Sequence, residues 1–177
     1  GDGGAIFTDV DELAQKMTSI RVHGSGTDRY DNVRLGINGR LDTLQAAILL
    51  EKMVIFQQEI IRRNEIAEYY TSKLSTHYIT PVITDGYMSS WAQYSLLAKS
   101  LEEREIVIEN LKLNNIPIMI YYKIPLHLQK IFSYLGYKKG DFPVSEECSG
   151  KIFSIPMHPY LETSGQDYIL EALHAAR

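Results

Sequence analysis

The stretch from Leu41 to Thr80 contains neither proline nor glycine, the two residues that most often end a helix. Apolar residues recur within it near helical spacing, at Leu41, Leu44, Ala47, Ile48 and Ile55. The pattern predicts one long helix over roughly residues 41–75, which at about 1.5 Å per residue is roughly 50 Å long. Such a helix outgrows a small domain, so we expect it to span an interface or to separate two domains.

The composition is that of an ordinary globular chain, and it excludes several classes of protein. Of the 177 residues, 45% are hydrophobic and 23% are charged, which is enough apolar material for one core. The net charge of −4 argues against a nucleic-acid partner. The single cysteine, Cys148, allows no internal disulfide and indicates a reducing compartment. No apolar run has the length of a membrane span and no signal-peptide pattern opens the chain, so we expect a cytoplasmic protein.

Helices and strands are predicted to alternate around the long helix. The predicted strands are residues 5–8, 78–83, 90–98, 116–122 and 152–156. The predicted helices are residues 10–20, 101–114, 125–135, 144–151 and 167–176, with Asp9 and Ser164 as caps and Gly136 closing the third. Pro81 favours an edge strand. The predicted fold class is therefore α/β, with a sheet of three or four strands covered by helices.

Glycines and hydrogen-bond donors crowd the segment that leads into the long helix. Gly36 and Gly39 allow a tight turn and a close approach of the backbone to a ligand. Asn38 offers an amide and Arg40 a planar fork of donors, both suited to a carboxylate or a phosphate. The free N–H groups of a helix start would add partial positive charge, so the segment predicts an anion site. In the alternative interpretation Asn38 only caps the helix and Arg40 is solvated, and spacing alone does not decide between the two.

Four segments stand in an order and at spacings that fit one known family. They are residues Gly1–Thr8, Gly36–Leu49, Ile124–Gln129 and Ile155–Leu161, the last two reading Ile-Pro-Leu-His-Leu-Gln and Ile-Pro-Met-His-Pro-Tyr-Leu. Together they resemble the DegT/DnrJ/StrS family of sugar aminotransferases, which use pyridoxal 5'-phosphate (PLP) to aminate keto sugars attached to nucleotides. The resemblance covers essentially all 177 residues.

The resemblance implies a domain organisation. Residues 1–37 are similar to the end of a large PLP-binding domain, and residues 38–177 to the connecting helix and small C-terminal domain of a fold-type I aminotransferase. In that fold the long helix packs with a small mixed sheet. The family's Schiff-base lysine sits just before the strand that Gly1 begins, so the chain reads as a fragment that would be inactive alone. No lysine of this chain stands in a matching context.

The resemblance also implies roles for four residues, in active sites shared between the two subunits of a homodimer. The residue matching Asn38 contacts the PLP phosphate of the neighbouring site, and the residue matching Arg40 holds an acidic substrate or the amino donor. His158 and Tyr160 are expected to hydrogen-bond a sugar hydroxyl or a carboxylate. The alternative for this pair is a rigid turn around Pro159 with a satisfied histidine. The histidines and the one cysteine show no metal-ligand spacing, and we expect no metal site.

The expected reaction is transfer of an amino group from glutamate to a nucleotide-linked keto sugar, in cell-surface polysaccharide or related amino-sugar biosynthesis. Residues 90–94 resemble the subgroup that acts on UDP-linked 3-keto-hexuronic acids, whose carboxylate would suit Arg40. Many relatives have His-Tyr-Pro where this chain has Tyr121-Tyr122-Lys123, a change that would alter which sugar fits. Two alternatives stay open. One is a PLP-dependent sugar dehydratase, in which histidine replaces the lysine, and the other is a non-catalytic dimerisation or regulatory module.

Overall fold

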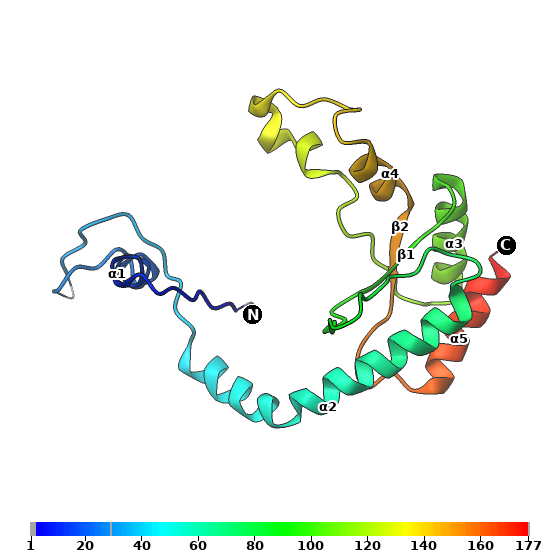
Figure 1. The fold of residues 1–177 in the computed structure, drawn as a ribbon, viewed down its shortest axis with the longest axis horizontal. Helices are drawn as coiled ribbons and strands as arrows, with labels where there is room; N and C mark the ends of the chain where they lie inside the picture. Colours follow the sequence, from blue (N-terminus) through cyan, green and yellow to red (C-terminus); the bar gives the residue numbers. More distant parts are fainter. Residues whose placement is uncertain (1–2, 29, 177) are drawn as a thin grey trace. The chain divides into compact units, whose positions relative to one another are not determined.

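A computed structural model describes residues 3–28 and 30–176, and its chain divides into two compact units (Figure 1). The first unit comprises residues 1–56 and the second residues 57–177. The first holds α1 (Asp11–Arg21) and the beginning of α2 (Thr43–Leu74). The second holds the rest of α2 and all the later helices and strands. The boundary predicted between residues 37 and 38 is of another kind, because it separates the two domains of longer relatives. It stays a prediction.

The predicted long helix is confirmed as α2, whose 32 residues extend about 48 Å. It begins two residues later and ends one residue earlier than the pattern predicted. In the second unit, one face of α2 is buried, and the residues on that face are Ile60, Ile66, Ala67, Tyr70 and Leu74. In the first unit the large apolar side chains of α2 are exposed, including Leu44, Ile48, Leu50, Met53 and Val54. The helix therefore derives its tertiary packing from its second half.

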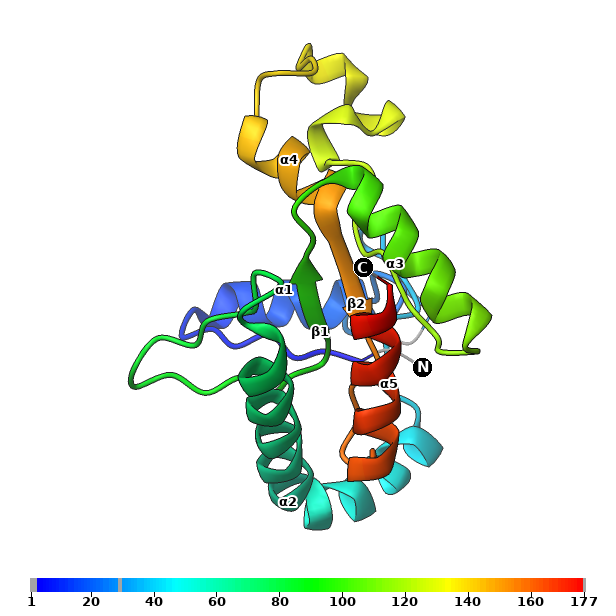
Figure 2. The same ribbon diagram turned by 90° about the vertical axis from the view of Figure 1, so that its right-hand side faces the viewer.

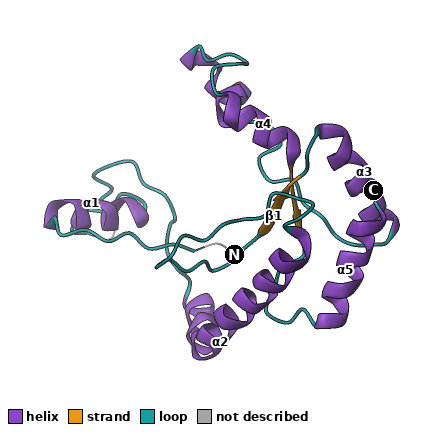
Figure 3. Ribbon diagram, turned by 45° about the vertical axis from the view of Figure 1, so that its right-hand side comes forward, coloured by secondary structure: helices purple, strands orange, loops and turns teal. Residues whose placement is uncertain are grey.

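The sheet of the second unit consists of β1 (Tyr94–Leu97) and β2 (Ile152–Ile155), which pair antiparallel (Figure 3). Tyr94 faces Ile155 and Leu97 faces Ile152 in the register. Single antiparallel bridges extend the pair on both sides, from Ile79 to Leu97 and from Met119 to Ser154. The described pairings are thus all antiparallel, so the sheet is not the mixed one that was expected.

Two of the predicted strands, 78–83 and 116–122, shorten to these single bridges. Each contains a proline two residues from its bridged residue: Pro81 follows Ile79, and Pro117 precedes Met119. Proline has no N–H group to donate, so the ladder ends there. The predicted strand 5–8 was wrong. Its residues lie exposed, and the described chain offers them no pairing partner.

Helices α3 (Leu101–Leu113) and α5 (Thr163–Ala175) pack against each other and close the core (Figure 2). The largest fully buried side chains come from α2, the two strands and these two helices: Tyr70, Tyr94, Phe153, Ile66, Leu74, Leu96, Leu111, Leu173, Gln166 and Val107. The Ser100 hydroxyl caps α3 by accepting a hydrogen bond from the Glu103 amide at 3.1 Å. The core is therefore assembled from elements far apart in the sequence.

Several predicted boundaries needed correction. The helix predicted at 125–135 is two short 3-10 helices, η1 (Leu126–Leu128) and η2 (Lys130–Leu135), interrupted at Gln129. Gly136 closes the second at a φ of 79°, as predicted. Helix α4 (Pro143–Lys151) begins on its proline, which suits a first helical position. Asp9 and Ser164 are not caps, because the N-cap residues of α1 and α5 are Val10 and Glu162.

We predict that Leu96→Ala lowers the free energy of unfolding by about 2–5 kcal/mol, because it leaves a cavity in the centre of the core. Leu96 in β1 is fully buried. The matched control is Leu113→Ala in the last turn of α3, where the side chain is 76% exposed. Urea titration followed by circular dichroism should show the loss for Leu96→Ala only. Equal losses for the two variants would contradict the assignment of the core.

Candidate functional site

Asn38 lies in a short antiparallel bridge and not at the start of a helix. Its bridge partner is Val22, just after α1. The amide of Ile37 donates to the carbonyl of Ile20 at 2.8 Å, and that of Gly39 donates to Arg21 at 2.9 Å. Helix α2 begins only at Thr43, so Asn38 neither caps it nor shares its first-turn N–H groups. The predicted helix-start geometry is therefore wrong, and the bridge to α1 positions Asn38 instead.

Glycine is required at position 36 because two backbone segments touch there. A Cβ atom on Gly36 would lie 2.0 Å from the amide nitrogen of Gly24 and 2.3 Å from the carbonyl carbon of His23. Gly24 itself has a φ of 75°, and a Cβ there would lie 1.8 Å from the carbonyl oxygen of Arg34. The close approach predicted for Gly36 is thus an approach to the chain's own backbone. It holds the Asn38 segment against the end of α1.

Asn38 and Arg40 form a pair that presents hydrogen-bond donors. The Arg40 Nε atom donates to Asn38 Oδ1 at 3.1 Å, and both side chains are exposed. This bond occupies the amide oxygen of Asn38, so its NH₂ group and the outer guanidinium N–H groups are left to donate. A cluster that offers donors and positive charge fits a phosphate or a carboxylate. The pair therefore has the chemistry to hold an anionic cofactor or substrate group.

His158 and Tyr160 lie on one turn after β2, and side chains of α2 hold that turn in place. Tyr70 donates its hydroxyl to the carbonyl of Pro156 at 3.2 Å, and Arg62 donates to the carbonyl of Leu161 at 3.2 Å. The Leu161 amide closes the turn on the carbonyl of His158 at 3.1 Å. These hydrogen bonds hold the backbone of the turn in place, while the His158 side chain itself is exposed.

Tyr160 reaches back to α2, where its hydroxyl donates a hydrogen bond to the Glu59 carboxylate. This bond raises the pKa of the Tyr160 hydroxyl, because ionising it would place a second negative charge beside Glu59. The phenol thus keeps its proton and stays in a fixed position. The structure brings together Asn38 with Arg40 in the first unit and His158 with Tyr160 in the second.

Sequence reasoning missed a pocket of about 500 Å³ in the second unit, between residues 121–127 and α4. Its lining residues are Tyr121, Tyr122, Pro125, Leu126, His127, Phe142, Ser145, Cys148, Ser149 and Ile152. The residues come from segments about twenty positions apart, which no local pattern connects. The excess of aromatic side chains around residues 121–122 was the one available signal.

Glu146 in α4 holds the wall of this pocket together. Its carboxylate accepts hydrogen bonds from the Gly140 amide at 2.8 Å and 3.0 Å and lies 3.0 Å from Nε2 of His127. The Phe142 amide also donates to it, at 3.4 Å. These bonds, chiefly that from Gly140, hold the pKa of Glu146 below its ordinary value of 4.5. The contact with Glu146 ties His127 to α4.

Within residues 3–28 and 30–176, no group of three His, Cys, Asp or Glu side chains could hold a metal ion. No helix of the described chain is long and apolar enough to cross a membrane.

Comparison with known proteins identifies the family to which the chain is similar. The model of the DegT/DnrJ/EryC1/StrS aminotransferase family matches residues 1–174. The chain is 42% identical to a UDP-2-acetamido-2-deoxy-3-oxo-D-glucuronate aminotransferase from Pseudomonas aeruginosa, covering 98% of this chain and 46% of that protein. It is 36% identical to a dTDP-3-amino-3,6-dideoxy-alpha-D-galactopyranose transaminase from Aneurinibacillus thermoaerophilus, covering 97% and 46%.

A solved structure shows the same fold. The crystal structure of a DegT DnrJ EryC1 StrS aminotransferase from Brucella abortus superimposes with a TM-score of 0.84 at 42% identity. The match covers 96% of this chain and 44% of that one. The predicted resemblance and fold class are thereby confirmed. The chain spans less than half the length of the curated relatives that it matches.

We predict that Gly36→Ala opens the bridge around Asn38, because the new methyl group must displace the backbone of residues 23 and 24. Amide hydrogen exchange at Ile37 and Gly39 should become at least about tenfold faster, as expected for overpacking of a tight contact. The matched control is Gly150→Ala in α4, where no atom beyond the adjoining helix backbone lies within 4 Å of the new Cβ. Unchanged protection in Gly36→Ala would refute the close backbone contact.

We predict that the Gly140 amide resonance titrates with Glu146 below pH 4.5. The folded pKa of Glu146 lies below its ordinary value, so the ionised carboxylate stabilises this loop above that value. The stabilisation is lost as the pH falls through the lowered pKa. Glu146→Gln should abolish the titration of Gly140, whereas Glu147→Gln should leave it, because Glu147 pairs with Lys151 instead. A Gly140 titration that survives in Glu146→Gln would show that another group causes it.

Proposed function

Because the chain belongs to the DegT/DnrJ/EryC1/StrS aminotransferase family, we propose that it is the carboxy-terminal part of a nucleotide-sugar aminotransferase. The reaction proposed is transfer of an amino group from glutamate to a keto sugar linked to a nucleotide. The observation that carries the proposal is the 42% identity, over 98% of this chain, to an enzyme named for such a reaction. We also propose that the reaction serves cell-surface polysaccharide or related amino-sugar synthesis.

Aminotransferases of this family depend on PLP, which supplies the electron sink for moving an amino group between two carbon centres. We propose that Asn38 contributes to holding the cofactor phosphate. The donor pair described above supports this, because the Arg40 contact leaves the Asn38 NH₂ group available to an oxygen anion. We further propose that the Schiff-base lysine is not among the lysines of this chain.

For Arg40 we propose contact with a carboxylate, either that of the amino donor or that of a hexuronic acid substrate. A guanidinium binds a carboxylate through two parallel hydrogen bonds, which orients the substrate as well as attracting it. His158 and Tyr160 would contact sugar hydroxyls from their rigid turn. The hydrogen bond from Tyr160 to Glu59 supports this role, because it already fixes the tyrosine side chain in the free protein. Binding a sugar then costs less side-chain entropy.

We propose a homodimer whose subunits share active sites, located in the cytoplasm. The exposed apolar side chains on the first-unit part of α2 support an assembly, because contiguous apolar surface of this kind is covered in stable proteins. The dehydratase alternative differs in one residue, the lysine or histidine that meets the cofactor. The regulatory-module alternative predicts no reaction with glutamate at all.

We predict that Arg40→Ala in the full-length protein raises the KM for its carboxylate-bearing substrate by at least about tenfold, while Arg40→Lys raises it less because charge is kept and the fork is lost. The assay follows 2-oxoglutarate released from glutamate in the presence of a UDP-linked 3-keto-hexuronic acid. Lys139→Ala, which removes an exposed cation of the 136–142 loop, is the control and should leave the KM unchanged.

The purified full-length protein also allows a test between the aminotransferase, the dehydratase and the regulatory module. Borohydride reduction with PLP should attach the cofactor to one lysine, and peptide mapping should find that lysine outside residues 1–177. No attachment together with loss of water from the sugar would favour the dehydratase. Attachment to a lysine of this chain, or the absence of any amino transfer, would overturn the proposal.

A further inference from the structure

The pocket beside α4 has a volume within the range of small-molecule sites, which is roughly 300–1,000 Å³. Its described lining includes no lysine, arginine, aspartate or glutamate, and most of its surface is carbon. A phosphate or a carboxylate would find no charged partner in it. The pocket therefore suits a neutral and largely apolar group.

Aromatic rings form the walls of the pocket, and one wall is held in place before any ligand binds. The Phe142 ring packs against the His127 ring at a centroid distance of 4.7 Å and against Tyr137 at 5.1 Å. Glu146 accepts one hydrogen bond from the Phe142 amide and lies 3.0 Å from Nε2 of His127, so the Phe142 backbone and the His127 ring are both tied to α4. Preorganised aromatic walls favour a flat ring that can stack on them.

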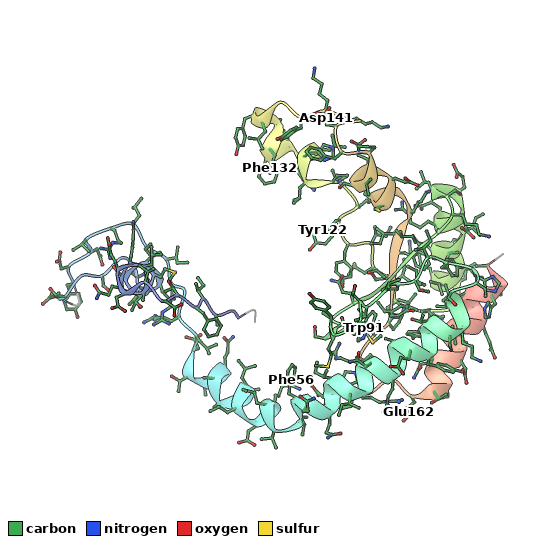
Figure 4. All side chains as sticks on the ribbon, viewed as in Figure 1. Phe56, Trp91, Tyr122, Phe132, Asp141 and Glu162 are labelled. Carbon is green, nitrogen blue, oxygen red and sulfur yellow. The ribbon has the colours of Figure 1, made fainter. Side chains whose placement is uncertain are left out.

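The other side of the pocket has a strained backbone. Tyr122 has a φ of 60°, in the left-handed region that a tyrosine rarely adopts. Its side chain is 77% exposed, so packing in the core does not explain the conformation (Figure 4). Residues with such a backbone are concentrated at functional sites, and this one places an aromatic ring at the edge of an aromatic pocket.

We propose that this pocket binds the pyrimidine ring of the nucleotide carried by the substrate, by stacking against Tyr122 and Phe142. This proposal rests on the proposed function, from which the nucleotide comes. The two relatives described above are named for UDP-linked and dTDP-linked sugars, and uracil and thymine are both pyrimidines. Stacking on aromatic side chains tolerates either base because both present the same flat face.

Cys148 allows a direct test, because it is the only cysteine of the chain and lines the pocket. The measurement is the rate at which iodoacetamide alkylates Cys148 in the 177-residue chain. Uridine should slow alkylation at least about fivefold and in a saturable way, whereas pyrophosphate should not. A UDP-sugar should protect as uridine does, which separates binding of the base from binding of the phosphates.

Two matched variants locate the ring. Tyr122→Asn removes the ring and keeps a residue that accepts the left-handed backbone, so protection by uridine should be lost. Tyr134→Asn removes a tyrosine that is equally exposed, at 78%, but lies outside the pocket lining, so protection should remain. Equal protection in the two variants, or protection by pyrophosphate, would overturn the proposal.

Saturation-transfer NMR with uridine gives a readout that does not depend on the thiol. The base protons should receive more saturation than the ribose protons, and a larger effect on the ribose would contradict the proposal. Failure of amino transfer in the full-length protein would refute the proposed function but leave uridine protection of Cys148 intact. Amino transfer without protection would refute the pocket alone.

Discussion

The apolar face that α2 turns into the second unit is the feature on which the rest of that unit depends. Ile66, Tyr70 and Leu74 follow one another at one-turn intervals and are fully buried. Burial of each such side chain contributes roughly 1.5–3 kcal/mol. Tyr70 also links the helix to two other elements, because its ring packs on Tyr94 at 5.2 Å and its hydroxyl binds the carbonyl of Pro156.

The same helix determines where the candidate substrate residues of the second unit lie. Glu59 and Arg62, which lie one to two turns before Ile66, reach the turn that carries His158 and Tyr160. Side chains held from a helix keep their geometry better than side chains on a free loop. The position of Asn38 has a different origin, which is the bridge to the end of α1 and the contact between two glycine backbones.

The sequence predicted the elements whose signals are local. An uninterrupted helical pattern located α2 within two residues, and the glycine at 136 ended η2 as expected. The strands around Pro81 and Pro117 were overestimated, because apolar alternation reports burial and does not show whether a neighbouring strand can accept hydrogen bonds. Asn38 and Arg40, two positions apart, were recognised as a pair. His127 and Glu146 were not, because nineteen positions separate them and only folding brings them within 3.0 Å.

By itself, the sequence determined the family and the long helix, because each depends on side-chain chemistry at short spacing along the chain. The tertiary structure decided that Asn38 is held by a bridge, that Tyr160 is fixed by Glu59, and that aromatic rings from residues 121–142 surround a pocket. These features arise from contacts between distant segments, whose free energy comes from burying surfaces against each other. No periodicity within one segment encodes which distant segment it will meet.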